Sequence, residues 1–295
     1  MSDPSSIHVP VLASEVVAAL APRPGQRVVD ATMGGGGHTR LLIQQVVPGG
    51  EVIGVDCDPH AIARAERELA GSPLRVAQSN YCELPEVLAA VGISHVHGIL
   101  LDLGLSSDQL ADEKRGFSYE ADGPLDLRFD PQRGEPAWRL LERLSAQHLA
   151  DIIYQFGEER HSRRIARRIV QQRRGRPIRR ARDLSELVRR CVPRSRNHPI
   201  DPATRTFQAL RIAVNDELKS LEIALRRLPD CLAPGGKLAI ISFHSLEDRR
   251  VKQAFRADSR LQPIARKPIR ATSEETRRNV RSRSARLRVA ERVDG

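Results

Sequence analysis

The chain of 295 residues has few aromatic residues, only four cysteines and no long apolar run. No stretch approaches the roughly twenty apolar residues of a membrane span, and no basic leader precedes a hydrophobic segment, so we expect neither a membrane helix nor a signal peptide. The four cysteines form no C-x-x-C pair and indicate neither a disulfide framework nor a zinc site. Scattered cysteines of this kind are typical of a protein in a reducing cytoplasm.

A metal site is not expected either. His95 and His97 alternate along a segment with strand character and could share one face as ligands. No cysteine or carboxylate lies in register to complete a ligand set, so the sequence predicts a protein that works without a metal.

Basic residues outnumber acidic residues, and the formal net charge is +11. Arginine carries most of the excess and is concentrated in two stretches without an acid, Arg160–Arg182 and Arg277–Arg288. An arginine-rich coding bias would spread the charge, whereas clustering favours a polyanionic partner, since guanidinium groups bind phosphates in a bidentate manner.

A glycine-rich turn is the most informative motif. A β-branched run ends at Asp30, glycines occupy 34–37, and residues 40–46 have helical character. This is a strand, a tight turn and a helix, the first unit of a doubly wound α/β fold. Val52–Asp56 supplies a second strand that ends in an acid, which is placed to accept hydrogen bonds from a ribose diol. The chain is therefore expected to bind a nucleoside-containing cofactor.

The pattern around the glycines discriminates between cofactors. A dinucleotide G-x-G-x-x-G fingerprint starting at Gly34 would need glycine where Thr39 stands. The order D-x-x-x-G-x-G, with Asp30 as its acid, suits S-adenosylmethionine better, although that pattern usually has a further glycine at the position of Thr32. An ordinary glycine-rich turn is the alternative.

The rest of the chain predicts one α/β domain that is interrupted by helices. We expect strands at 27–31, 52–56, 74–78, 97–103, 235–243 and 285–293, and helices at 11–20, 38–46, 59–70 and 83–91. A long loop at 105–136 is followed by helices at 138–144, 147–156, 160–173 and 183–191, a loop at 194–202, and helix at 204–232 with a break near Asn215. Asp183 and Ser245 are the expected N-caps of their helices.

These elements define the predicted organisation. The fold class is α/β, a doubly wound, Rossmann-like fold with an inserted helical domain. Residues 1–108 and 214–295 form the α/β domain, residues 109–213 form the insertion, and a polar, basic segment at 257–283 is expected to be a mobile loop.

Six longer motifs follow in one order. They are Leu100–Leu110, Arg115–Tyr119, Gly123–Arg128, Gly157–Arg160, Thr204–Ala209 and Ile241–Arg249. Together they resemble the bacterial small-subunit ribosomal RNA cytosine-N4 methyltransferase family, MraW/RsmH, from about residue 8 to residue 292. The glycine loop is also similar to that family's, with Met33 and Gly35 as mild variations.

The resemblance implies methyl transfer from S-adenosylmethionine to the exocyclic N4 of a cytidine in the decoding region of small-subunit ribosomal RNA, as naked RNA or in the assembled subunit. It also implies a Rossmann-like, S-adenosylmethionine-dependent methyltransferase fold, with residues 1–108 and 214–295 as the methyltransferase domain, and it implies the cofactor contacts. Gly36, Gly37 and His38 would meet the amino-acid end, Asp56 the ribose, and Tyr81 the adenine, while Asp102 and Gln109 would complete the pocket. A helix-start role for His38 and a core role for Tyr81 are the structural alternatives.

Asp102 is the candidate catalytic residue because it follows a buried parallel strand, at the edge where such sheets bind ligands. Amine methyltransferases often have Pro-Pro-aromatic after this acid, whereas Leu-Gly-Leu follows Asp102 here. An acceptor beside the target amine would stabilise the positive charge that grows on nitrogen in the transition state. His244 is a candidate proton acceptor, and orienting a helix cap is its structural alternative.

The RNA contacts are predicted from aromatic residues and from arginine spacing. A base that is methylated in an enclosed site must leave its stack and rest on another surface. Phe117, Tyr119 and Phe243 are candidate platforms, with a core role as the alternative. Arginines at 160, 163, 164, 167 and 168 form one helical stripe, from which Arg163 and Arg167 are the candidate phosphate contacts. Pairing with Glu158, Glu159 or other acids within the protein is the alternative.

Two other functions compete with this one. A protein amine could be the acceptor on the same fold, but the sequence has no acidic patch to receive a basic tail. A non-catalytic RNA-binding assembly factor could retain the fold, and the intact glycine loop, Asp56 and Asp102 argue against that.

Overall fold

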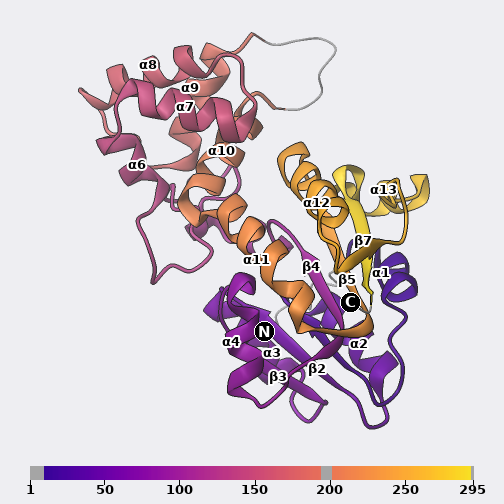
Figure 1. Ribbon diagram of the computed structural model, residues 1–295. Coiled ribbons are helices and arrows are strands. Elements are labelled where there is room, and N and C mark those ends of the chain that lie inside the picture. The colour runs from indigo at the N-terminus through magenta and orange to yellow at the C-terminus, as the bar shows by residue number, and fades with distance from the viewer. Residues whose placement is uncertain (1–9, 194–200, 294–295) are drawn as a thin grey trace. The chain divides into compact units, whose positions relative to one another are not determined.

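The computed structural model describes residues 10–193 and 201–293. The chain divides into two compact units, one made of Met1–Leu105 and Leu218–Gly295 and the other of Ser106–Glu217 (Figure 1). The insertion predicted at 109–213 lies inside the second unit. Most of the loop predicted at 194–202 lies outside the described residues.

The first unit is built on a seven-stranded sheet with the order β3-β2-β1-β4-β5-β7-β6. Its strands are β1 (Arg27–Asp30), β2 (Glu51–Asp56), β3 (Leu74–Gln78), β4 (Val96–Asp102), β5 (Leu232–Ser242), β6 (Leu261–Pro263) and β7 (Arg286–Arg292). The first five run parallel, and β7 is antiparallel to both β5 and β6. This confirms the predicted α/β class.

Helices cover both faces of this sheet because its central strands are apolar on both sides. Along β1, Val28 belongs to one core cluster and Val29 to the other, and Leu100 and Leu101 alternate in the same way along β4. The first cluster includes side chains of α1 (Ala13–Leu20) and α2 (Gly37–Val46). The second includes α4 (Leu84–Ala90), α11 (Glu217–Cys231) and α12 (Ser245–Ala257). The unit also contains α3 (Pro59–Glu68) and the short 3-10 helix η1 (Tyr81–Glu83).

The second unit is helical. It contains α5 (Ser107–Ala111), η2 (Glu113–Arg115), α6 (Ala137–Arg143), α7 (Ala146–Gly157), α8 (Ser162–Arg173), α9 (Ala181–Cys191) and α10 (Ala203–Asn215). The predicted loop at 105–136 holds α5 and η2, and its later part is fastened by Asn215, which donates to the Leu127 carbonyl and accepts from the Phe129 N–H, both at 2.7 Å. Within the described residues, no helix combines the length and apolarity that a bilayer crossing requires.

Two predicted helix caps are wrong, each by a short shift. Helix α9 begins at Ala181 after an extended Arg180, so Asp183 lies in the first turn rather than at the cap. Helix α12 is capped by His244 instead of Ser245, in a capping box with Glu247. The predicted break near Asn215 is confirmed, because Asp216 adopts a left-handed conformation with φ of 50° between α10 and α11.

The basic segment at 257–283 is not an irregular loop throughout. It contains β6, α13 (Ser273–Arg278) and the start of the 3-10 helix η3 (Val280–Ser284). Glu275 of α13 accepts a hydrogen bond from the backbone N–H of Leu12 at 2.7 Å, and Ile269 pairs with Leu287 of β7. The segment is therefore attached to both ends of the first unit. Its mobility stays a prediction.

Candidate active site

Three carboxylates mark the carboxyl ends of neighbouring parallel strands. Asp30 ends β1, Asp56 ends β2 and Asp102 ends β4. Strand β1 lies between β2 and β4. Strands β2 and β3 are therefore added on one side of β1 and strands β4 and β5 on the other, which makes β1 the topological switch point of the sheet. Ligands of open α/β sheets bind beyond the strand ends at such a switch point. The sheet topology thus brings the predicted acids Asp56 and Asp102 to the expected edge.

Asp56 organises the glycine loop. Its carboxylate accepts the Gly34 N–H at 2.7 Å and the Asp58 N–H at 2.9 Å, one on each oxygen. Burial raises the pKa of Asp56 to about 6, and these two N–H groups oppose that rise. Because a carboxylate oxygen can accept more than one hydrogen bond, both oxygens keep capacity for ribose hydroxyls. Gly36, with φ of 75°, caps α2 in a left-handed conformation that suits glycine.

Asp30 is a site residue that the sequence showed only as the acid of a pattern. It is 1% exposed and accepts the Thr39 hydroxyl at 2.7 Å, which joins the end of β1 to the first turn of α2. Burial raises the pKa of Asp30 to about 6. Thr32, at the position where glycine is usual, accepts the N–H of Asp102 at 2.6 Å. The loop is therefore fastened to two strand ends, which positions it for ligand binding.

His38 and Asp102 come together from different elements. The Nε2 atom of His38, in the first turn of α2, lies 3.7 Å from Oδ2 of Asp102, and the side chains are 6% and 19% exposed. Oδ1 of Asp102 makes no hydrogen bond with any residue that the structure describes. Burial lowers the pKa of His38 to about 4, against the opposing effect of the Val11 carbonyl. The imidazole is therefore neutral near pH 7.

Burial and neighbouring charges have opposing effects on the pKa of Asp102. Burial raises the pKa of this carboxyl to about 7, and the negative charges of Asp30 and Glu247 act in the same direction. The positive charge of Arg281 lowers the pKa. Asp102 is thus a carboxyl group that can change protonation state close to neutral pH, a property common in catalytic groups.

Arg281 and Phe243 complete this edge of the first unit. The Arg281 guanidinium, on η3, donates to the Leu105 carbonyl and lies 6.0 Å from the centroid of the Phe243 ring. Phe243 directly follows β5, whose Ile241 pairs with Asp102. Sequence reasoning named Phe243 but missed Arg281, since it lies in the segment expected to be a mobile loop.

Tyr81 and His244 have structural contacts as well as predicted roles. Tyr81 begins η1 after β3 and packs, half-buried, against the core cluster of its unit. His244 Nδ1 accepts the Glu247 N–H at 3.4 Å, and its Nε2 lies 3.2 Å from Glu247 Oε1. These contacts give His244 a capping role, and its role as a proton acceptor stays a prediction.

The predicted residues of the second unit differ in exposure. Phe117 is only 5% exposed and packs against Phe129 with 5.9 Å between ring centroids, so its prediction as an open stacking platform is wrong. Tyr119 is partly exposed, edge-on to Phe207 and 5.7 Å from the Arg189 guanidinium. Gln109 forms a capping box with Ser106 at the start of α5.

Four of the five arginines of the predicted stripe lie on one face of α8. Arg163, Arg164, Arg167 and Arg168 are exposed, whereas Ile165 and Ile169 are fully buried on the opposite face. Arg160 precedes the helix. Among the described residues, no acidic side chain forms an ion pair with these four arginines. Buried Glu159 accepts the His161 N–H at 2.7 Å instead of pairing with the stripe.

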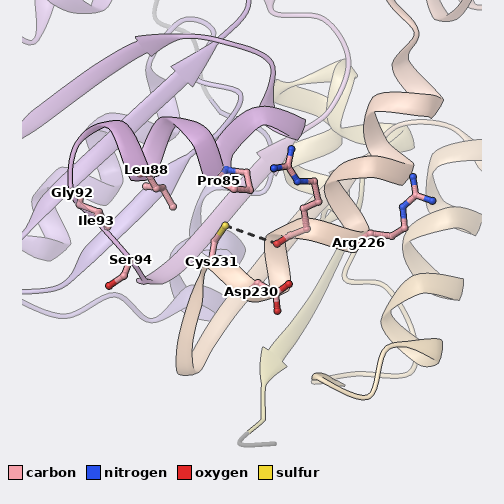
Figure 2. Close-up of a pocket in the computed structure, with 10 residues that line it drawn as sticks. Pro85, Leu88, Gly92, Ile93, Ser94, Arg226, Asp230 and Cys231 are labelled. Atoms are coloured by element: carbon pink, nitrogen blue, oxygen red, sulfur yellow. Dashed lines mark hydrogen bonds between the residues drawn. The ribbon is translucent and has the colours of Figure 1, made fainter.

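A separate pocket of about 590 Å³ lies between α4 and the end of α11 (Figure 2). Ile93 and Ser94 line it just before β4, and Cys231 lines it just before β5. It is therefore near the amino ends of these strands, opposite the edge that carries Asp102.

Within the described residues, no group of three or more histidine, cysteine or acidic side chains is arranged to hold a metal.

The fold and the strand-end site together define a Rossmann-like, S-adenosylmethionine-dependent methyltransferase. The glycine loop, an acid at the end of β2 and an acid at the end of β4 are the required parts. The orphaned Oδ1 of Asp102 fits a polar ligand at the same edge, because buried polar atoms normally have partners.

Comparison with known proteins identifies the family. The chain matches the MraW methylase family over residues 5–293 and belongs to it. It is 50% identical to a ribosomal RNA small subunit methyltransferase H of Rhodopirellula baltica, covering 97% of this chain and 92% of the relative. It is 52% identical to the corresponding protein of Deinococcus radiodurans, covering 99% and 92%. The cofactor is S-adenosylmethionine, as the sequence predicted.

Solved structures with similar folds are more distant. An rRNA methylase of Streptococcus thermophilus is 12% identical with a TM-score of 0.43, covering 96% of this chain and 94% of that chain. Fibrillarin of Aeropyrum pernix, in complex with S-adenosyl-L-methionine, is 10% identical with a TM-score of 0.44, covering 94% and 74%.

Proposed function

We propose that this protein transfers a methyl group to the exocyclic N4 of a cytidine in the decoding region of small-subunit ribosomal RNA. The names of relatives at 50% and 52% identity support the small subunit as the source of the RNA. The acceptor atom is supported by one observation, the partly buried Asp102 carboxyl, whose buried Oδ1 has no described partner, at the sheet's switch point. The cytoplasm, where such RNA would be met, remains the expected location.

The cofactor would be held by the residues that surround the glycine loop. S-adenosylmethionine supplies an electrophilic methyl group on a sulfonium. Asp56 would accept the ribose hydroxyls, and the backbone of Gly36 and Gly37 with His38 would bind the amino-acid end. Tyr81 would lie near the adenine. Gln109, with Asp102, would complete the pocket.

Asp102 would act on the amine. The N4 nitrogen is conjugated with its ring and is a poor nucleophile. Positive charge would grow on it as the N–C bond formed and the bond from sulfur to the methyl carbon broke. N4 would then lose a proton, for which His244 remains a candidate acceptor. A carboxylate oxygen that accepts an N4–H hydrogen bond stabilises that charge more in the transition state than in the ground state. Neutral His38, 3.7 Å from this carboxylate, adds no charge beside it.

Residues of the second unit would also bind RNA. The target cytidine must leave its stack to reach a strand-end site. Partly exposed Tyr119 remains a candidate stacking surface for an RNA base. The exposed face of α8, with Arg163 and Arg167, would bind phosphates.

Methylation of unmodified small subunits tests this function. Protein, labelled S-adenosylmethionine and small subunits lacking the modification are incubated, and the RNA is digested to nucleosides. Label in N4-methylcytidine is expected. Label in another nucleoside, or in a ribosomal protein, would show that the methyl acceptor is not N4 of cytidine. Cofactor binding without transfer to subunits or naked RNA would favour a non-catalytic assembly factor.

A further inference from the structure

Val280 is an apolar side chain held out in solvent. It is 75% exposed, the largest value among the exposed large hydrophobic residues of the described chain. It begins the 3-10 helix η3, a short element between α13 and β7. A single exposed valine is common on protein surfaces, so exposure alone indicates no function. Its fixed backbone and its neighbours distinguish this one.

The backbone on either side of Val280 is tied down. The Asn279 side chain accepts the Arg281 N–H at 3.2 Å, and the Ser282 hydroxyl donates to the Asn279 carbonyl at 2.8 Å. Ser282 and Ala285 are 1% and 2% exposed, so the far side of η3 is buried in its unit. Because the turn is anchored, the position of Val280 is set by the fold rather than by a free loop.

The residue after Val280 reaches the candidate active site. The Arg281 guanidinium donates to the Leu105 carbonyl, just beyond the end of β4, and lies 6.0 Å from the Phe243 ring centroid. Its charge lowers the pKa of Asp102. One peptide unit therefore separates a side chain that faces solvent from one that acts on the catalytic edge.

The segment of chain that contains η3 is basic. Arg277 and Arg283, three residues before and after Val280, are exposed, and so are Arg266, Lys267 and Arg270 earlier in the segment. No acidic group of the described chain forms an ion pair with any of these five. The two acids of α13 have other partners, since Glu274 pairs with Arg278 at 2.6 Å and Glu275 accepts the Leu12 N–H. An exposed apolar residue between the exposed arginines Arg277 and Arg283 fits a nucleic-acid strand better than an apolar protein partner.

We propose that η3 is the element that opens the RNA stack: Val280 enters the space vacated by the target nucleotide, and the flanking basic side chains hold the adjacent phosphates. Proteins that extrude or unstack bases use apolar side chains as wedges in this manner, and the wedge compensates part of the lost stacking. The inference rests on the proposed function, because it needs an RNA substrate whose base is moved to Asp102.

The test compares two RNA hairpins with the same loop and sequence around the target cytidine. In the first, the cytidine is stacked in a helix; in the second, it is bulged and already unstacked. Both carry 2-aminopurine as the 3′ neighbour. Fluorescence on binding of the full chain with S-adenosylhomocysteine reports unstacking, and single-turnover methylation with S-adenosylmethionine reports transfer. Val280→Ser is the test variant, and Ile264→Ser, which changes another exposed apolar residue of the same segment, is the matched control.

Val280→Ser should slow unstacking and transfer on the stacked hairpin by about tenfold and leave the bulged hairpin within about twofold of wild type, since only the first needs a wedge. Ile264→Ser should match wild type on both. Wild-type rates for Val280→Ser on the stacked hairpin, an equal loss on both hairpins, or no fluorescence rise with wild type would overturn the proposal. Fluorescence that rises with wild type without methyl transfer would instead count against the proposed function alone.

Discussion

The hydroxyl of Thr39 donates to the carboxylate of Asp30 at 2.7 Å, and both side chains are buried. This bond closes the glycine loop, because it joins the strand before the loop to the helix after it. The loop's conformation therefore depends on a contact between two side chains as well as on its glycines.

Replacing Thr39 with valine should destabilise the fold. The substitution keeps the shape and leaves the buried Asp30 oxygen without its donor, which costs about 1–3 kcal/mol. Urea unfolding measures the change in the free energy of unfolding. Thr39→Ser, which retains the hydroxyl, is the control and should lose less. Equal stability of Thr39→Val and wild type would show that the bond contributes nothing to the loop.

Asp56→Ala should weaken S-adenosylmethionine binding. Each hydrogen bond lost from a ribose hydroxyl to this carboxylate should cost roughly 1.5–3 kcal/mol. Isothermal titration calorimetry measures the affinity. Since Asp56 also holds the Gly34 and Asp58 N–H groups, the melting temperature of the variant must be compared with that of Glu66→Ala, an exposed acid on α3. Unchanged affinity in a folded Asp56→Ala protein would remove Asp56 from the ribose site.

Asp102 should control the methyl-transfer step and its pH dependence. The ionised carboxylate is the better acceptor, so the single-turnover rate should rise as pH increases through about 7 and then level off. Asp102→Asn should lower the rate at saturating RNA and cofactor much more than it lowers RNA affinity, and should remove this pH dependence.

Arg281 gives this prediction an internal check. Its positive charge lowers the pKa of Asp102, so Arg281→Gln should move the midpoint of the rate profile to higher pH. A profile that is flat in wild type, or identical in wild type and Asp102→Asn, would make Asp102 a structural residue.

The arginine stripe on α8 should bind RNA through phosphates. Changing Arg163 and Arg167 together to glutamine should weaken RNA binding with little dependence on sequence. It should also flatten the salt dependence by about one phosphate contact per arginine. Fluorescence anisotropy at several salt concentrations measures both effects, and cofactor affinity should not change. The matched control is Arg23→Gln with Arg67→Gln, which removes two exposed charges from the other unit. A lower melting temperature with unchanged RNA binding would mean that the stripe serves stability.

The strand–turn–helix units were predictable because strand periodicity and glycine turns are local signals. Asp56 and Asp102 were found this way, since strand ends meet at one edge whenever strands are parallel. The arginine stripe followed from helical spacing alone. Each of these predictions uses residues that are close in the sequence.

Contacts between residues that are far apart in the sequence could not be predicted from it. Arg281 is separated by more than 170 residues from Leu105, whose carbonyl it binds, and nothing in its polar surroundings indicated that contact. Phe117 is buried because Phe129 and its neighbours fold over it, which a loop-like composition concealed. His244 replaced Ser245 as a cap because its ring nitrogen accepts the Glu247 N–H as a hydroxyl would.

The order in which the chain is made has a consequence for this sheet. Strands β1 to β4 precede the inserted unit, while β5 and β7 follow it, and β7 ends at Arg292. On the ribosome, the helical unit has all of its residues before the methyltransferase sheet does. One edge of strand β4 therefore remains unpaired until β5 has been synthesised. The sheet that carries Asp102 is complete only when β7 has left the ribosome. A chain that is cut short directly after the insertion would contain all residues of the helical unit but only strands β1 to β4 of the sheet.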